Sequence, residues 1–311
     1  MAKVTNSFTT YDATSDREQL SNMIYMISPT QTPFFTSIKK NKTRNVIFDW
    51  QTQNLSTPTG VGQLEGFELS RSASPATVRE SNVTMILKRD ATVSNTQASS
   101  DPAGKGKGEM AWQMSVAAKD LKRDVETAIC QNFAKNAGNA TTVRATRSFE
   151  AWAVNASRGS GGAAGTTSAA ATDGTQRALT ETLFMDVMTL CFQNGGEPSL
   201  AICGPVNKQK ISDFTGRASA REVIGADEVQ QSVAIYISDF GTVKIMASNF
   251  SRERSVLLVD PNMAAVTYLR DFQTQDIANI GDAKTKLLTV EMGLEISNAL
   301  AHGVVADLTI T

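Results

Sequence analysis

The longest regular pattern of hydrophobic and polar positions in the chain covers residues 109–135. Its apolar residues recur three and four positions apart, as on one face of an α-helix, and charged residues fill the opposite face. The apolar face consists of Met114, Ala117, Ala118, Leu121, Val125, Ala128, Ile129 and Phe133. A helix of this length spans roughly 40 Å. Two interpretations fit: an ordinary long core helix, and a spine that braces an elongated, sheet-rich molecule.

Alternation of apolar and polar residues predicts strands on both sides of this helix. Strands are expected at 46–50 and 83–87, and the most regular alternation covers 288–296. Residues 304–310 are expected to return beside that last strand. Residues 52–76, rich in Gly, Ser, Thr and Pro, separate the first two strands, whereas a hairpin loop usually has about 2–5 residues. In a compact monomer, a loop of this length would be evidence against the strand assignment, whereas in a protein that reaches onto a neighbour it is a natural arm.

Shorter elements follow one another between residues 180 and 250. Thr180 is placed to cap a helix whose apolar face ends at Gly195-Gly196. The pattern then predicts a strand at 200–203, a helix from Pro205 through Phe214, a β-hairpin that turns at Asp239-Phe240-Gly241, and a strand at 256–259. The predicted fold class is therefore α+β, with one long helix near a long-stranded sheet and a second αβ lobe.

The N-terminal block is apolar but small. Residues 1–14 are polar and predict an extended arm, and residues 15–18 form a capping box for a short helix that Pro29 stops. Thr32-Pro33 begins a second helical turn. The apolar residues of the block are Leu20, Met23, Ile24, Ile27, Phe34, Phe35 and Ile38. The block cannot bury these side chains by itself, so they must pack on the rest of the chain or on a neighbouring one.

Two further stretches lack a regular period. Residues 158–174 are almost entirely Gly, Ala, Ser and Thr, which predicts a flexible surface loop. Residues 215–231 form a second polar loop, which carries Arg217 and Arg221.

Composition narrows the class of protein. Among 311 residues, 41% are hydrophobic and 20% are charged, as in soluble globular proteins. The formal net charge of −1 gives no electrostatic case for nucleic-acid binding, which depends on excess Lys and Arg. The cysteines Cys130, Cys191 and Cys203 form no CxxC pair and are expected to be buried thiols in a reducing compartment. Neither a signal peptide nor a membrane-spanning apolar run is visible, so we expect the chain to fold in a cytoplasm.

The sequence predicts neither a catalytic site nor a cofactor or metal site. His302 is the one histidine, and a lone histidine after a strand is more often structural than catalytic. Zinc sites need Cys and His clusters that this sequence lacks. The run GKGKGE, which includes Lys105, lacks the spacing of a phosphate-binding loop. We therefore do not expect an enzyme.

Five stretches, taken in order, resemble the major capsid proteins of tailed bacteriophages, which have the Hong Kong 97 type fold. The resemblance is closest to a branch once known only as a domain of unknown function. The matching stretches are LSNMIYMISPTQTPFF, VAAKDLKRDVETAI, LTETLFMDVMTLCFQNGGEP, IYISDFGTVKIMAS and VLLVDPNMAAVTYLRDFQTQDIANIGDAKTKLLTVEMGLEISNALAHG. Together they cover almost the whole chain.

The resemblance implies a division of the chain. It places an N-terminal arm at 1–45, an E-loop β-arm at 46–95, a P-domain spine helix and the following loop at 96–179, an A-domain at 180–255, and strands that return to the P-domain at 256–311. Assembly contacts are expected in the arm, the E-loop and the 215–231 loop; the candidates are Leu20, Ile24, Ile27, Phe34, Phe35, Leu64, Phe67, Leu69, Arg217 and Arg221.

The resemblance also implies partners and a location. Chains of this kind form hexamers and pentamers of themselves, which build an icosahedral shell around packaged double-stranded DNA that is held non-specifically. A portal protein at one vertex is expected. The chain begins directly with its arm, so we expect a separate scaffolding protein rather than a built-in one. The predicted location is the virion, with assembly in the host cell cytoplasm and no membrane partner.

Some shells of this fold are cross-linked through a lysine of the E-loop, but residues 51–87 contain no lysine, so we do not expect that chemistry here. Two alternatives share features with the main interpretation. An encapsulin-like shell of a cellular compartment has the same fold, and a cytosolic enzyme with a mobile lid at 52–76 would belong to a different class.

Overall fold

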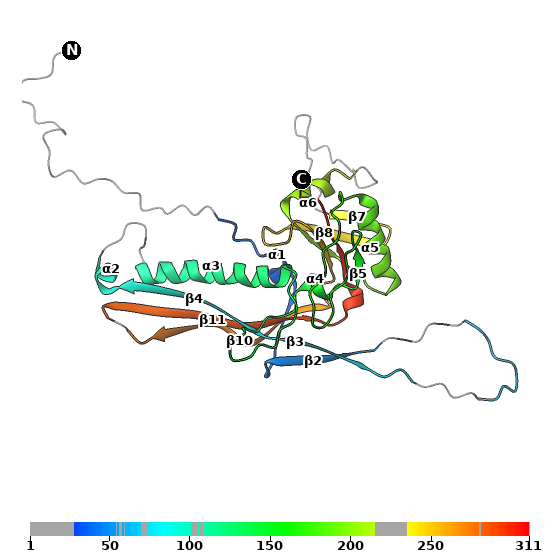
Figure 1. Ribbon diagram of the computed structural model, residues 1–311, viewed down its shortest axis with the longest axis horizontal. Coiled ribbons are helices and arrows are strands. Elements are labelled where there is room, and N and C mark those ends of the chain that lie inside the picture. Colours follow the sequence, from blue (N-terminus) through cyan, green and yellow to red (C-terminus); the bar gives the residue numbers. More distant parts are fainter. Residues whose placement is uncertain are drawn as a thin grey trace, which may run out of the picture.

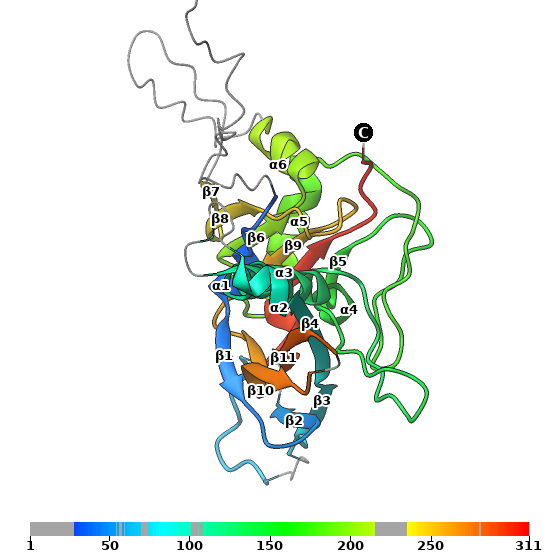
Figure 2. The same ribbon diagram turned by 90° about the vertical axis from the view of Figure 1, so that its left-hand side faces the viewer.

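The computed structural model describes residues 28–53, 55, 58, 60–69, 74–100, 105, 108–214, 235–279 and 281–310. Figure 1 shows an elongated molecule in which a long helix lies along a long-stranded sheet, a lobe stands at one end of the helix, and a thin arm extends beyond the lobe. Figure 2 looks along the length of the molecule and shows the helix between the sheet and the lobe. The predicted α+β class is confirmed.

The elements fall into two groups along the chain. The first group ends with the long helix and contains α1 (Pro33–Ser37), β1 (Lys39–Lys42), β2 (Ile47–Thr52), β3 (Val78–Val83), β4 (Met85–Ser94), α2 (Asn95–Ser99) and α3 (Glu109–Cys130). The second group contains α4 (Phe149–Trp152), β5 (Asn155–Ser157), α5 (Glu181–Gln193), β6 (Leu200–Cys203), α6 (Pro205–Ser212), β7 (Ile235–Ser238), β8 (Gly241–Ala247), β9 (Val256–Val259), β10 (Ala264–Ile277), β11 (Ala283–Ile296), the 3-10 helix η1 (Ala299–Ala301) and β12 (Gly303–Val305).

The helix α3 confirms the predicted spine, but it ends at Cys130 and not at residue 135. Its buried face includes Leu121 and Val125, as the spacing predicts. The early end has a local cause: the Phe133 amide donates to Ser148 Oγ at 2.6 Å, and the Phe133 carbonyl accepts from the Ser148 amide at 3.1 Å. This segment therefore pairs with the residues before α4, and Phe133 is exposed instead of lying on the apolar face.

The helix α3 packs on a four-stranded sheet with the order β1-β10-β11-β4. The predicted strand at 288–296 is the second half of β11, whose Val290 and Met292 share a core with Leu121 and Val125. The sequence pattern does not predict β10, although it is as long as β11. Register shifts after Tyr268 and after Arg270 break its alternation, and alternation is the signal by which strands are recognised.

The lobe is built on a six-stranded sheet with the order β5-β12-β9-β6-β8-β7. The predicted strands at 200–203 and 256–259 are the fully buried β6 and β9, and the predicted hairpin is β7–β8. Thr180 caps α5 through a bond from the Leu183 amide, also as predicted. Side chains of α5 and α6 cover one face of this sheet, and the opposite face joins the core beneath α3.

One strand lies in a different place from the one predicted. Residues 304–310 were expected beside the strand at 288–296, but β12 pairs with β9 and with β5 in the other sheet. The cause is η1, which turns the chain directly after β11. The C-terminal segment thereby ties the two sheets together.

The three cysteines and His302 are buried, as was expected for the cysteines. Cys130, Cys191 and Cys203 are all buried; burial raises the pKa of Cys191 to about 11 and that of Cys203 to about 12. His302 is buried against the edge of Phe149, and its Nδ1 accepts a hydrogen bond from the Asp260 amide at 3.1 Å. Among the helices of the described residues, none has both the length and the apolar content of a membrane span.

The buried imidazole makes stability depend on pH. Burial lowers the pKa of His302 to about 4, below the ordinary value near 6.5. The contribution of His302 to stability is therefore complete above about pH 6.5 and is lost as the pH falls towards 4, because the unfolded chain binds the proton first. We expect wild type to lose about 2 kcal/mol more unfolding free energy than His302→Asn between about pH 7.5 and 5. Urea titrations at both pH values measure this difference, and equal losses would contradict it.

Candidate assembly surfaces

The strands β2 and β3 form a two-stranded ribbon that runs away from both sheets (Figure 1). From here on, "the arm" means this ribbon together with the chain between its two strands, and not the N-terminal segment. They pair in antiparallel register from Ile47 with Val83 to Thr52 with Val78. In β2 the row of Phe48 and Trp50 faces the body while Ile47 and Asp49 are exposed. The strand β3 has no apolar row, and its buried residues, Asn82 and Val83, lie at the end next to the body. Between Thr52 and Val78, the described residues of the arm form no further strand.

The root of the arm is fixed firmly to the body. The rings of Phe48 and Trp50 stack at 5.9 Å, and Trp50 lies 5.4 Å from Trp152 of α4. The buried Asn82 side chain accepts from the Arg147 amide at 2.9 Å and donates to the Arg147 carbonyl at 3.2 Å. Lys135 donates to the Ser81 carbonyl, and burial lowers its pKa.

The tip of the arm, which we define as residues 60–69, has no such support. Leu64 is 85% exposed and Phe67 is 57% exposed, and Leu69 and Val61 are exposed as well. The described part of the tip contains one backbone hydrogen bond, from the Phe67 amide to the Leu64 carbonyl. The structure therefore leaves three predicted contact residues, Leu64, Phe67 and Leu69, with their apolar surfaces open, and they remain candidate assembly contacts.

The N-terminal segment is anchored on the body by a buried carboxylate. Glu126, on the buried face of α3, accepts hydrogen bonds from the amides of Phe34 at 3.0 Å and Phe35 at 2.7 Å. It also accepts from Ser248 Oγ at 3.1 Å, in the loop between β8 and β9. Burial raises the pKa of Glu126, and these bonds from Phe35, Phe34 and Ser248 oppose that rise. One carboxylate thus joins α1, the spine helix and the lobe.

This anchor corrects two of the predicted contact residues. Phe34 and Phe35 are buried within their own chain, and the Phe34 ring meets Phe149 edge to face at 5.3 Å. They offer no surface to a neighbour, because α1 docks on α3 and β1 extends the four-stranded sheet beside β10. The predicted contacts Leu20, Ile24, Ile27, Arg217 and Arg221 lie outside the described residues.

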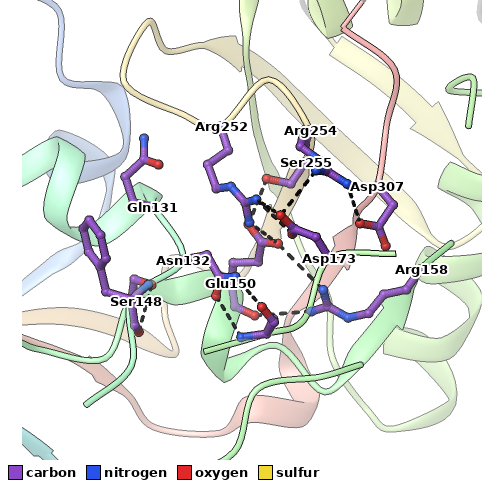
Figure 3. A network of polar contacts seen from close by, with 12 residues as sticks. Gln131, Asn132, Ser148, Glu150, Arg158, Asp173, Arg252, Arg254, Ser255 and Asp307 are labelled. Atoms are coloured by element: carbon purple, nitrogen blue, oxygen red, sulfur yellow. Dashed lines mark hydrogen bonds and ion pairs between the residues drawn. The ribbon is translucent and has the colours of Figure 1, made fainter. Parts of the chain in front are cut away.

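A second buried carboxylate lies where α4 meets the lobe (Figure 3). Both oxygens of Glu150 accept from Arg252 Nη1 at 2.9 Å, and Ser255 Oγ donates to one of them at 3.1 Å. The second terminal nitrogen of the Arg252 guanidinium, Nη2, donates to both oxygens of Asp173. Burial lowers the pKa of Arg252, but the carboxylates of Glu150 and Asp173 more than offset this, so the pKa is raised.

Asp307 fixes the two ends of the stretch 158–174. Its buried carboxylate accepts from the Gly159 amide at 3.0 Å and from the Gly174 amide at 2.7 Å. The residues between them form a surface loop, as the composition predicts. A Cβ at Gly159 would lie 2.0 Å from the Thr175 carbonyl oxygen, so glycine here permits close backbone approach and not mobility.

The exposed apolar side chains at the tip of the arm suit contact between chains. Among the described residues, no group of three or more His, Cys, Asp or Glu side chains could hold a metal ion. The buried carboxylates Glu126, Glu150 and Asp307 are bonded to amides, hydroxyls and arginines of the same chain. None of the three was predicted from the sequence. For Asp307 the sequence holds one signal, the glycines Gly159 and Gly174 whose amides it binds.

Comparisons of the sequence with known proteins match it to major capsid proteins. The sequence model of the SU10 major capsid protein family matches residues 3–309. The major capsid protein of Escherichia phage Phieco32 is 32% identical over 129 residues, which cover 41% of this chain and 36% of that protein. The matched region thus spans little more than a third of this curated relative.

Solved capsid structures share the fold. A cyanophage A-1(L) capsid chain gives a TM-score of 0.71 at 11% identity and covers 97% of this chain and 100% of its own. The capsid chain of a native GTA particle gives a TM-score of 0.67 at 10% identity, over 96% and 98% of the two chains. A chain of Gordonia phage Cozz gives a TM-score of 0.63 at 12% identity and covers 98% of this chain and 96% of its own. The fold is therefore that of Hong Kong 97 type capsid proteins.

The anchor of the N-terminal segment can be tested by mutation. Glu126→Ala leaves two buried amides and a hydroxyl without their acceptor, and each such loss costs about 1–3 kcal/mol. We expect a clear loss of unfolding free energy and faster tryptic cleavage at Lys39, Lys40 and Lys42, because β1 follows α1 directly. Glu126→Gln keeps one acceptor and should lose less.

The control is Glu197→Ala, which removes an exposed carboxylate from the turn after α5. Urea unfolding and mass spectrometry of the tryptic fragments measure both effects. Cleavage of Glu126→Ala at the wild-type rate would show that the carboxylate does not hold the segment.

Proposed function

Because this chain belongs to the SU10 major capsid protein family and has the Hong Kong 97 type fold, we propose that it assembles as hexamers and pentamers into the icosahedral shell of a tailed bacteriophage. Capsid proteins of this family are structural and are not enzymes. The family match and the curated phage relative favour a phage shell over a cellular compartment of the same fold. The location of such a protein is the virion.

The observation that carries this proposal is the contrast between the arm's root and its tip. The root is packed on Trp152 and bonded to Arg147, whereas Leu64 and Phe67 at the tip are open to solvent. Full burial of one large apolar side chain contributes about 1.5–3 kcal/mol. An arm that is rigid at its base and apolar at its end is suited to a second copy of the same chain. Because the arm and the surface that receives it are different parts of the chain, the contacts are heterologous and can close into rings.

The enclosed genome and the other partners belong to the same proposal. The chain has 30 Lys and Arg against 31 Asp and Glu. This balance suits a shell that encloses double-stranded DNA without binding it tightly. A separate scaffolding protein during assembly, a portal protein at one vertex and assembly in the host cytoplasm follow from the resemblance to tailed-phage capsids.

Electron microscopy of the purified protein tests the proposal. We expect closed shells from the wild-type chain. The double variant Leu64→Ser with Phe67→Ser should melt at the wild-type temperature, because both side chains are mostly exposed, but it should form no shells. Val154→Ser, which changes another exposed apolar residue on the body, should still form shells. Normal shells from the double variant would contradict the role of the arm, and a stable monomer from wild type would contradict the function.

A further inference from the structure

The outer face of the four-stranded sheet has a hollow that its own chain leaves open. The residues Leu87 and Val290 point into the core beneath α3, so their neighbours Ile86 and Glu291 face the opposite side. On that side, Ile86 and the turn at 139–144 line a hollow of about 300 Å³. Two of its lining side chains are apolar and exposed: Ile86 is 48% exposed and Val143 is 83% exposed.

The charged groups around this hollow are mostly cationic at the surface. Arg144 lines it, Lys88 lies two residues beyond Ile86 on the same face of β4, and Arg270 follows on β10. The carboxylates are Glu291 and Asp90. Glu291 is buried beneath the hollow and is already bonded to Arg144 Nη2 at 2.7 Å and to Arg270 Nε at 2.8 Å. The hollow is thus lined by Ile86 and Val143 together with polar residues of the turn, and Lys88 is exposed beside Ile86, with Asp90 two residues farther along β4.

The arm tip has the complementary character. Phe67 stands between Glu65 and Glu68, and residues 60–69 contain these two carboxylates and no cation. A hydrogen bond from the Phe67 amide to the Leu64 carbonyl closes a turn, so the apolar residues Leu64 and Phe67 lie at its two ends. In Figure 1 the arm runs away from the sheet of its own chain, so a hollow that receives it belongs to another copy.

We propose that Phe67 of one copy inserts between Ile86 and Val143 of an adjacent copy, with Glu68 facing Lys88. This inference rests on the proposed function and names the surface on which the arm docks. The contact removes exposed apolar area on both chains and pairs opposite charges at its edge. It is heterologous, since each copy gives one arm and receives another, so repetition around an axis closes a ring.

Cysteine cross-linking tests the contact. The three native cysteines are buried, so added exposed cysteines react selectively. Assembled Glu65→Cys/Thr142→Cys protein keeps Phe67, Ile86 and Val143 in place. Treated with a short bis-maleimide, it should give a covalent ladder extending to pentamers and hexamers on a denaturing gel. Each single variant can give dimers at most. The matched control Glu65→Cys/Val154→Cys places the second thiol at another exposed site of the body and should give no ladder.

A charge exchange between Glu68 and Lys88 gives a second test. Glu68→Lys should reduce shell yield several-fold, and so should Lys88→Glu, whereas the two together should restore most of it. The control Glu197→Lys adds the same charge change at an exposed site on the lobe and should leave the yield unchanged.

The outcomes separate the two proposals. If shells form but the 65–142 pair links no better than the 65–154 control, and the charge exchange gives no rescue, the docking surface is wrong while the shell function stands. If wild-type protein forms no shells under any assembly condition, the proposed function itself fails.

Discussion

The packing of α3 on one face of the four-stranded sheet is the interaction on which the rest of the structure depends. Leu121 and Val125 meet Val290 and Met292 there, and the same core includes the inner face of the lobe's sheet. A single helix can cover only one face of a sheet. The opposite face is covered in part by Phe48 and by Arg144, which meet Gly293 and Glu291 of β11, while Ile86 and the hollow beside it stay open.

Buried carboxylates hold the remaining parts to this core. Glu126 joins α1 and the Ser248 loop to the helix, Glu150 joins α4 to Arg252, and Asp307 holds both ends of the 158–174 stretch. Each is satisfied by several donors, which is the condition under which a buried charge is tolerated. These bonds fix the body of the subunit up to the root of the arm, whereas the apolar side chains of the arm tip stay exposed.

Local periodicity accounts for what the sequence could predict. The spine helix, the Thr180 cap, the buried strands β6 and β9 and the β7–β8 hairpin all follow from spacing and turn chemistry. Features set by distant contacts could not be predicted: Glu126 meets Phe34 across 92 positions, and η1 diverts β12 into the other sheet. The register shifts in β10 erase its alternation. The exposed tip residues were predictable because their surroundings offer too few apolar partners to bury them, whereas the burial of Phe34 depends on a carboxylate that no local pattern reveals.

The central claim is that residues 60–69 are covered only by another copy of the chain. Hydrogen exchange followed by mass spectrometry, on dissociated subunits and on assembled shells, tests it most directly, with peptides from α3 as an internal reference. Amides of the tip are expected to exchange rapidly in subunits and slowly in shells, while those of α3 are protected equally in both. Equal and strong protection of the tip in the two states would contradict it, because the tip would then be covered by its own chain.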